Sequence, residues 1–436
     1  MPKIEAFPGY RYNVSKVGSL SNVVAPPYDV IDEKLQDELY AKHPDNVVRL
    51  ILNKINEKDD TEQDNRYTRS AQTLEQWKKD EVLVQEDKPA IYVYHQIYEV
   101  AGKKYVRKGF MCRCEAVPFG QGMVFPHEQT LSGPKMDRLM LTTACKTNFS
   151  QIFGLYPDSN NDVQTILEKA IEGLEVSEAT DHLDVVHQMW VVTDPEVIRQ
   201  VTEAMGPKPI FIADGHHRYE TACNYRKQIA QTGTLTPDHP ANFVLMVCIA
   251  MEDPGLIVLP THRLFRKVPY FSQQDLIEKL GDCFRVTTIG DGAVLAQRAW
   301  THIELADRQD NIAIYTGKDG RWSLIQMTEA GKARMDTVAA DHHPEWRELG
   351  VAILHRLVID TLLGLEGHEK PRYVHQVSEV VDGLRDQTEE FPLAALVMPA
   401  TVAQIQTLSM LGERMPAKST YFYPKLITGF VFNPLE

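Results

Sequence analysis

Residues 210–222 read I-F-I-A-D-G-H-H-R-Y-E-T-A, and no other part of the chain is as informative. Ile210 to Ala213 predicts a short buried strand, Asp214 and Gly215 predict a turn, and apolar residues at helical spacing after His217 predict a helix. The first amides of a helix have no partner inside it, and the helix dipole adds positive charge there. A glycine just before the helix lets an anion approach the backbone. This order of strand, glycine and helix predicts a phosphate-binding turn.

The polar residues of the turn add chemistry to it. His216, His217 and Arg218 supply donors, and the guanidinium can hold a phosphate through two parallel hydrogen bonds. Asp214 can bind a metal ion, orient a histidine or act as a base. The alternative is a plain helix start, with Asp214 as its N-cap and two surface histidines. Adjacent side chains on a helix diverge, so we do not expect both histidines to bind one metal ion.

Three further segments place polar residues in loops or at strand ends. They are the proline-bearing loop before Asp29, the long segment from Pro118 to about Asn148, which we expect to be a loop with a helix at its end, and the strand end Thr261-His262-Arg263. The candidate ligand-binding residues of the long loop are His127, Glu128, Lys135 and Arg138. Loops this long usually carry function or are disordered. We expect all three segments to line one cleft with Asp214 to Arg218. A solvated surface loop is the competing interpretation.

Outside this centre, the pattern mixes hairpins with strand–helix units. Strands are predicted at 91–94, 105–116, 152–156, 187–192 and 243–250, and helices at 163–174 and 195–205. The run at 243–250 is apolar enough to be a central strand. The predicted fold class is α+β, with a mixed rather than a purely parallel sheet.

The sequence pattern changes after about residue 268. A helix is predicted at 272–284, a hairpin from 312–315 to 322–327, a long amphipathic helix at 344–365, a strand at 391–398 and a helix at 402–413. A chain of 436 residues exceeds one comfortable hydrophobic core. We therefore expect two domains, a core of residues 1–267 and an additional C-terminal α/β portion of residues 268–436 that packs on it.

Composition narrows the classes of function. The net charge of -14 argues against a general affinity for nucleic-acid backbones, so DNA is not an expected partner. No apolar run is long enough to span a membrane, and the first residues do not resemble a secretory signal, so a cytoplasmic protein is expected. Six cysteines in a chain of this length do not predict a disulfide framework. Cys112 and Cys114 are expected to be buried free thiols.

The motif D-G-H-H-R-Y-E-T-A at 214–222 resembles the phosphate loop of the ParB/sulfiredoxin superfamily, which includes ParB nucleotidases, sulfiredoxins and the free-serine kinases of archaea. Nearly the whole chain is similar to the domain of unknown function 1015 family. The stretches that carry this second resemblance are A-P-P-Y-D-V-I (25–31), P-H-E-Q-T (126–130), K-M-D-R-L (135–139), L-P-T-H-R-L (259–264) and M-P-A-K-S-T (415–420).

The resemblance implies a ParB/sulfiredoxin-like mixed-sheet core that binds a nucleotide or phosphate. In the serine kinases, an early proline-bearing loop supplies the catalytic carboxylate, and its loose counterpart here is Asp29, where glutamate is usual. Sulfiredoxins have a reactive cysteine within the loop. Because His216 stands at or near that point, sulfiredoxin chemistry is not expected. The DNA-binding helix-turn-helix of ParB is not evident after the loop.

The leading hypothesis is a nucleotide-dependent phosphotransferase that acts on a small hydroxylated metabolite, of which a serine-like compound is one example. The amides of Gly215 to His217 and Arg218 would hold phosphate, and Asp29 or Asp214 would accept the substrate proton, with His216 as a third candidate catalytic group. The expected cofactors are ATP or ADP and Mg²⁺, which phosphates and a carboxylate would share. Hydrolysis of a nucleotide or phosphate ester is one alternative. A nucleotide-gated switch or a chromosome-partition-like binding module is another. Homo-oligomer formation is left open.

Overall fold

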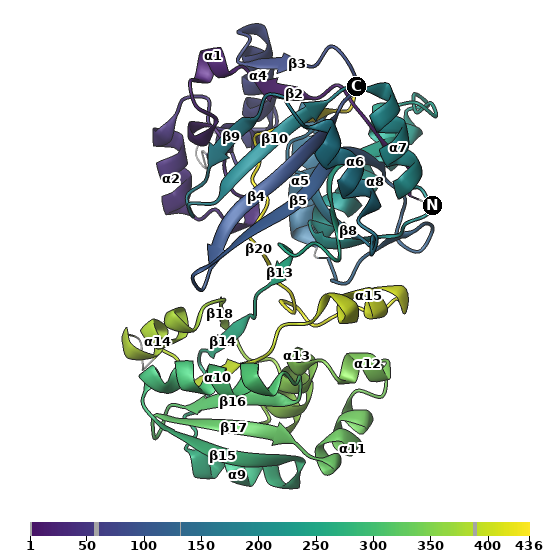
Figure 1. The fold of residues 1–436 in the computed structure, drawn as a ribbon. Helices are drawn as coiled ribbons and strands as arrows, with labels where there is room; N and C mark the ends of the chain where they lie inside the picture. Colours follow the sequence, from purple (N-terminus) through teal and green to yellow (C-terminus); the bar gives the residue numbers. More distant parts are fainter. Residues whose placement is uncertain (1, 56–60, 131, 387–389) are drawn as a thin grey trace. The chain divides into compact units, whose positions relative to one another are not determined.

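A computed structural model describes residues 2–55, 61–130, 132–386 and 390–436. The chain divides into two compact units, one formed by Met1–Ile257 with Pro424–Glu436 and the other by Val258–Tyr423. The division expected from sequence, 1–267 and 268–436, differs from these units at two places. The segment 258–267 belongs to the second unit, because β14 (His262–Phe265) pairs with strands of that unit. The end of the chain returns to the first unit, which is visible as the yellow trace in Figure 1.

The first unit is built on a nine-stranded mixed sheet. Its strand order is β6-β11-β8-β12-β5-β4-β10-β9, with β1 paired to β5. The strands are β1 (Ile4–Glu5), β4 (Ile91–Val100), β5 (Lys103–Glu115), β6 (Val124–Phe125), β8 (Ile152–Tyr156), β9 (Ser177–Thr180), β10 (Val186–Val192), β11 (Ile210–Asp214) and β12 (Phe243–Ala250). The pairs β6–β11 and β8–β12 are parallel, and the pair β8–β11 between them is antiparallel. The prediction of a mixed sheet with 243–250 as a central strand is confirmed.

Three helices cover one face of this sheet, and Figure 1 shows them gathered on one side of it. They are α6 (Asp162–Ala170), α7 (Pro195–Met205) and α8 (His216–Gln231). Alternate residues of β4 and β5, among them Val93 and Phe110, point into the same core as Val163 and Tyr219 of the helices. Burial of this apolar surface is the main force that fixes α8, and hence its first turn, against the sheet.

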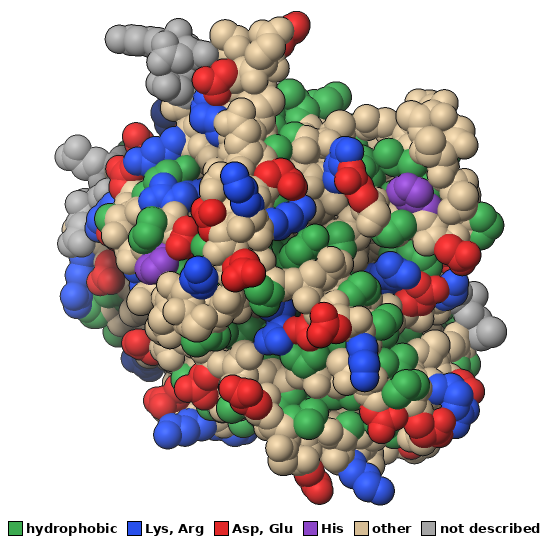
Figure 2. Space-filling model, turned by 90° about the horizontal axis from the view of Figure 1, so that it is seen from above, with side chains coloured by type: hydrophobic (Ala, Val, Ile, Leu, Met, Phe, Trp, Pro, Cys, Tyr) green, Lys and Arg blue, Asp and Glu red, His purple; other side chains and the backbone are tan. Residues whose placement is uncertain are grey.

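The remaining elements of the first unit are short or peripheral. They are α1 (Val14–Val17), α2 (Glu33–Lys42), α3 (Val48–Ile51), α4 (Arg66–Lys79), α5 (Ser132–Cys145), the short helices η1 (Leu20–Asn22), η2 (Tyr28–Val30) and η3 (Pro240–Asn242), and the strand pairs β2 (Tyr10–Tyr12) with β3 (Leu83–Gln85) and β7 (Thr147–Asn148) with β21 (Asn433–Pro434). On the face drawn in Figure 2, basic and acidic side chains are interspersed rather than gathered by sign.

The second unit contains an antiparallel sheet in the order β15-β17-β16-β19-β14-β18. Its elements are β14, α9 (Gln273–Leu280), η4 (Gly281–Cys283), β15 (Phe284–Asp291), η5 (Ala293–Leu295), α10 (Ala296–Ala306), β16 (Asn311–Thr316), β17 (Arg321–Met327), α11 (Glu329–Val338), α12 (Pro344–Arg347), α13 (Gly350–Ala352), η6 (Ile353–Leu362), β18 (Arg372–Val374), α14 (Val377–Asp386), β19 (Leu393–Leu396) and α15 (Val402–Met410). Two short strands, β13 (Ile257–Val258) and β20 (Phe422–Tyr423), lie where the chain passes between the units.

The long helix predicted at 344–365 is wrong as a single element. It breaks at Leu349, whose ψ of 129° is extended, and continues as α13 and η6. The cause is a tertiary contact, because the Gly350 amide donates to the Gln309 side chain at 2.8 Å. Within the described residues, no helix is both long and apolar enough to cross a membrane.

Candidate functional site

Two parallel strands end side by side at the site. β6 and β11 pair through Val124 with Ile210 and Phe125 with Phe211, and the two phenylalanine rings stack 5.3 Å apart. Because the strands run in the same direction, the segments that follow them leave the sheet at the same end of the strands. Ligands of α/β sheets gather at the carboxyl ends of such strands. The structure therefore brings the segment 126–128 next to Asp214 and the start of α8.

Gly215 shapes the start of α8. It is the N-cap residue with φ of 92°, and it has no side chain of its own to cap the helix. A Cβ atom here would meet the guanidinium of Arg218 at 3.0–3.1 Å. Both the backbone conformation and the close guanidinium thus require glycine at this position. The result is a helix N-terminus that directly follows a glycine, which lets an anion approach the backbone closely.

Asp214 is held by two cations. One carboxylate oxygen accepts from Arg218 at 2.7 Å and the other from Lys425 at 2.9 Å. Arg218 also donates to the carbonyl of Gln151 at 2.6 Å. Burial raises the pKa of Asp214, but the charges of Lys425 and Arg218 outweigh it and hold this pKa well below its usual range. The carboxylate is therefore ionised, and it fixes the orientation of both cations.

His216 turns inward, toward the segment that follows β6. Its side chain and that of His127 are buried, and the two rings meet edge to face with centroids 4.7 Å apart. The backbone amide of His127 donates to Nε2 of His216 at 3.3 Å, so the proton of the neutral ring lies on Nδ1. That nitrogen faces the carboxylate of Glu128 at 3.6 Å. These contacts join the two loops.

Lys135 and the Asp29 loop approach the same helix. Glu220, one turn into α8, accepts from Thr130 at 2.6 Å and from Lys135 at 2.7 Å. Burial lowers the pKa of His217, while the nearby charges of Glu220 and Asp29 act in the opposite direction. Lys135 of α5 and Asp29 are thus within electrostatic range of the first turn of α8.

Arg138 and Arg218 line one small cavity together with Tyr28. The guanidinium of Arg138 stacks over the Tyr28 ring at 4.0 Å and donates to the carbonyl of Ile51 at 2.8 Å. The cavity has a volume of about 40 Å³, enough for a group the size of water. Asp29, the residue after Tyr28, is exposed. Three segments that are distant in sequence therefore meet at Arg218.

Thr261, His262 and Arg263 belong to the second unit. His262 and Arg263 are 0% exposed, and Arg263 donates to the carbonyls of Thr261 and of Lys418 and to His355. Burial lowers the pKa of His262 to about 3, so its ring is neutral. These residues serve the interior of their own unit. Their place in a cleft shared with Asp214 stays a prediction.

Several residues of the site were not foreseen. Lys425 and Gln151 lie far from Asp214 in the sequence, and no local pattern points to either. Glu220 stands four residues after His216, so helical periodicity could have found it.

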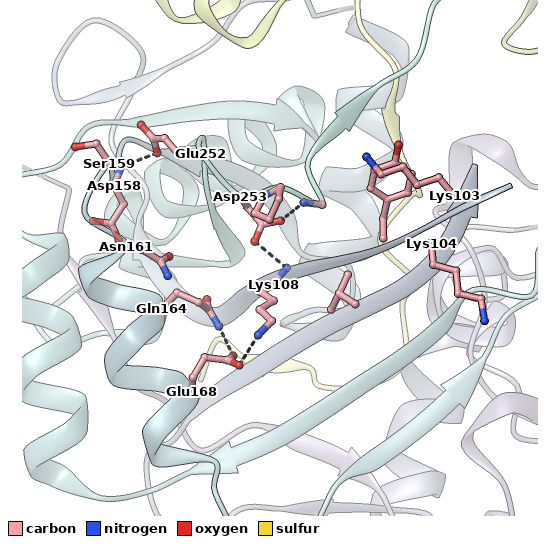
Figure 3. A pocket seen from close by; sticks show the side chains of 14 residues that line it. Lys103, Lys104, Lys108, Asp158, Ser159, Asn161, Gln164, Glu168, Glu252 and Asp253 are labelled. Carbon is pink, nitrogen blue, oxygen red and sulfur yellow. Dashed lines mark hydrogen bonds and ion pairs between the residues drawn. The ribbon is translucent and has the colours of Figure 1, made fainter. Parts of the chain in front are cut away.

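The described residues contain no group of three or more His, Cys, Asp or Glu arranged to hold a metal ion. A larger groove of about 630 Å³ lies beside β5 and the segments that follow β8 and β12, and no residue predicted for the site lines it. Figure 3 shows its walls, with Lys103 and Lys104 on one side and Glu252 and Asp253 on another. The volume of a groove therefore does not locate the candidate chemistry in this unit.

Comparisons with known proteins give one family. The model of the family described as "Protein of unknown function (DUF1015)" matches residues 4–352, in agreement with the sequence resemblance. No curated protein matches the chain.

The similar solved structures include a free serine kinase in complex with AMP, at 12% identity and a TM-score of 0.30, over 69% of this chain and 83% of that one. A conserved hypothetical protein from Pyrococcus furiosus has 11% identity and a TM-score of 0.33, over 71% and 91%. A mutant free serine kinase in complex with ADP has 12% identity and a TM-score of 0.31, over 69% and 84%. Likeness at these TM-scores carries no argument about function.

Proposed function

We propose that this chain, which belongs to the DUF1015 family of proteins of unknown function, binds the phosphates of a nucleotide at the start of α8 and transfers a phosphoryl group to a small hydroxylated metabolite. The observation that carries the proposal is the helix start itself: β11 ends beside the parallel strand β6, and Gly215, with φ of 92°, leads directly into α8. Because the motif D-G-H-H-R joins β11 to α8, we propose that the first unit has a ParB/sulfiredoxin-like core.

The phosphate would bind the first amides of α8, from Gly215 to His217. Helix amides and dipole favour an anion there, and Arg218 lies against Gly215 with its orientation fixed by Asp214. Lys135 and Arg138 would stabilise the charge that spreads over the phosphoryl oxygens during transfer. Buried His216 would keep the Glu128 segment in place beside the helix start.

Asp29 is the best candidate for the general base. In the transfer, the acceptor oxygen forms a bond to phosphorus, the bond from phosphorus to the bridging oxygen breaks, and the electron pair leaves with the nucleoside diphosphate. The acceptor proton passes to Asp29. A base must be able to take up a proton, and the two cations that hold Asp214 ionised make it a poor one. Asp29 is exposed and therefore accessible to an acceptor molecule.

The carboxylates of the site also fit Mg²⁺. This ion is usually held by one or two carboxylates together with phosphate oxygens, so a cluster of three protein ligands is not required. Asp29 is exposed, and the Glu128 carboxylate lies 3.6 Å from Nδ1 of His216, so these two carboxylates are the candidates. When bound with ATP, Mg²⁺ would neutralise phosphate charge. The residues of this chain would orient the nucleotide and the acceptor.

The proposal is tested by incubating the protein with ATP, Mg²⁺ and a panel of small hydroxylated compounds that includes hydroxyl amino acids. Transfer predicts that ADP forms in proportion to a phosphorylated acceptor and only when the acceptor is present. Release of inorganic phosphate without an acceptor would identify a hydrolase. Nucleotide binding without turnover would favour a switch or binding module. If neither ATP, ADP nor phosphate binds in calorimetry, the proposal is wrong.

A further inference from the structure

Two cations share the carboxylate of Asp214. A single carboxylate is shared by two cations, Arg218 at 2.7 Å and Lys425 at 2.9 Å. Their side chains are 12% and 18% exposed, so solvent screens the charges only in part. An ammonium group has three N–H donors and can serve Asp214 and a phosphate oxygen together. Lys425 thus adds a second positive charge beside Arg218 at the start of α8.

Lys425 reaches the site through the C-terminal segment Pro424–Glu436, which lies along the first unit. The side chain of Gln96 donates to the carbonyl of Lys425 at 3.0 Å. Arg107 is 1% exposed, donates to the carbonyl of Pro424 and is joined to Gln96. Both backbone carbonyls next to the Lys425 side chain are thus held by buried donors, which restricts where the ammonium can lie.

A buried relay fixes the same segment two residues further on. Burial lowers the pKa of His187, so its ring is neutral. The carboxylate of Asp181 can only accept, so Nε2 of His187 donates to it at 3.1 Å, and Nδ1 accepts from the Tyr94 hydroxyl at 2.6 Å. The Tyr94 oxygen in turn accepts from the amide of Ile427, and the Gln151 side chain donates to the Ile427 carbonyl at 2.8 Å. Hydrogen bonds from side chains of the first unit therefore hold the backbone on both sides of Lys425.

We propose that Lys425 is a phosphate-binding residue of the site, presented by the clamped C-terminal segment, and that Asp214 acts as the counter-ion that holds Lys425 and Arg218 ready for the ligand. This inference rests on the proposed function. It adds a ligand contact from the far end of the chain, which no motif in the sequence marks.

The test compares two lysines that have similar ion pairs. Lys425→Met removes the proposed contact. Lys208→Met is the matched control, because Lys208 is also 18% exposed and pairs with Asp158 at 3.0 Å, at the end of β11 opposite to Asp214. Binding of ADP and of inorganic phosphate is measured by calorimetry at two salt concentrations, with the melting temperature of each variant. Lys425→Met should weaken ADP binding about 10- to 100-fold and reduce its salt dependence. Lys208→Met should leave both unchanged.

Two further variants complete the test. Lys425→Arg should retain part of the affinity, because it keeps the charge. Lys425→Gln keeps a donor for Asp214 without the charge. It should also lose affinity for ADP, and it provides the test if Lys425→Met fails to fold. Equal ADP affinity and salt dependence in the wild-type protein and Lys425→Gln would overturn the role of Lys425 alone. Absence of ADP and phosphate binding in the wild-type protein would overturn the proposed function as well.

Discussion

The parallel strand pairs β6–β11 and β8–β12 run in opposite directions, so the helices that follow them start at opposite ends of the sheet strands. At one end β11 leads to α8, and the Asp214 carboxylate before this helix pairs with Arg218 and Lys425. At the other end β8 leads to α6, and Asp158 accepts from the amide of Val163 in the first turn of that helix at 3.0 Å. The second oxygen of Asp158 accepts from Lys208 at 3.0 Å.

This difference distinguishes a structural helix start from one that suits a ligand. At α6 the protein supplies both the anion and its counter-ion, and Asp158 is buried. At α8 the carboxylate of Asp214 binds cations rather than helix amides, so the positive end of the helix and the two cations act together. A parallel strand pair followed by a helix thus contributes stability at α6 and, in our proposal, binds phosphate at α8.

The largest expected effect is on turnover, and it separates the carboxylate of Asp29 from that of Asp158. Asp29→Asn should lower phosphoryl transfer by about 100- to 10,000-fold, as the loss of a general base does. Because Asp29 is exposed, the free energy of unfolding should change by less than about 0.5 kcal/mol. Asp158→Asn should do the reverse, leaving turnover intact and costing about 3 kcal/mol, because it leaves Lys208 without its buried partner. Steady-state kinetics and urea unfolding of both variants provide the measurement. Full turnover in Asp29→Asn would end its role as the base.

A smaller effect is expected at the glycine that starts α8. Gly215→Ala places a Cβ in a left-handed conformation and against Arg218, so it should cost about 1–2 kcal/mol and weaken ADP binding about tenfold. Gly233→Ala is the control, because Gly233 also has a positive φ of 74° but open space around it. It should lose stability through backbone strain alone and keep its affinity. If the two variants bind ADP equally well, the α8 start is not the phosphate site.

Local signals explain which parts of the fold were predictable. The helix predicted at 195–205 is confirmed as Pro195–Met205, since an Asp194 cap and a proline in the first turn mark its start. The helix predicted at 344–365 failed because the contact that breaks it comes from Gln309. Strand periodicity placed 243–250, and its central position followed from its apolar faces.

The same distinction applies to the candidate site. Asp214 to Arg218 could be singled out because a strand, a glycine and a helix stand in one short stretch. Lys425 could not, since 211 residues separate it from Asp214 and the chain forms a whole second unit in between. Thr261 to Arg263 looked like site residues from their polarity. Their complete burial in the second unit was beyond sequence reasoning, because it depends on contacts with His355 and Lys418.

The smallest expected effect is a difference in how stability depends on pH at the two ends of the strands. Asp214 is the titrating group at one end. The folded-state pKa of Asp214 lies below its ordinary value of 3.8, so it binds fewer protons in the folded state than in the unfolded state. Its contribution to stability is present above about pH 4 and is lost as the pH falls through the folded-state pKa. Asp214→Asn should remove this acid-sensitive part of the stability.

Asp253, which lines the groove beside β5, should give a pH dependence of stability with the opposite sign. Burial raises its pKa from 3.8 to about 6, so the folded state binds the extra proton between these values and stability falls as the pH rises through this window. The group is partly exposed, so the expected loss is about 1 kcal/mol rather than the full value of the shift. Asp253→Asn keeps an acceptor for the amide of Gly255, which donates to Asp253 at 2.9 Å, but cannot ionise. Urea unfolding from pH 4 to 7 should therefore show a flatter decline in Asp253→Asn than in the wild-type protein. Parallel curves would mean that folding does not raise the pKa of Asp253.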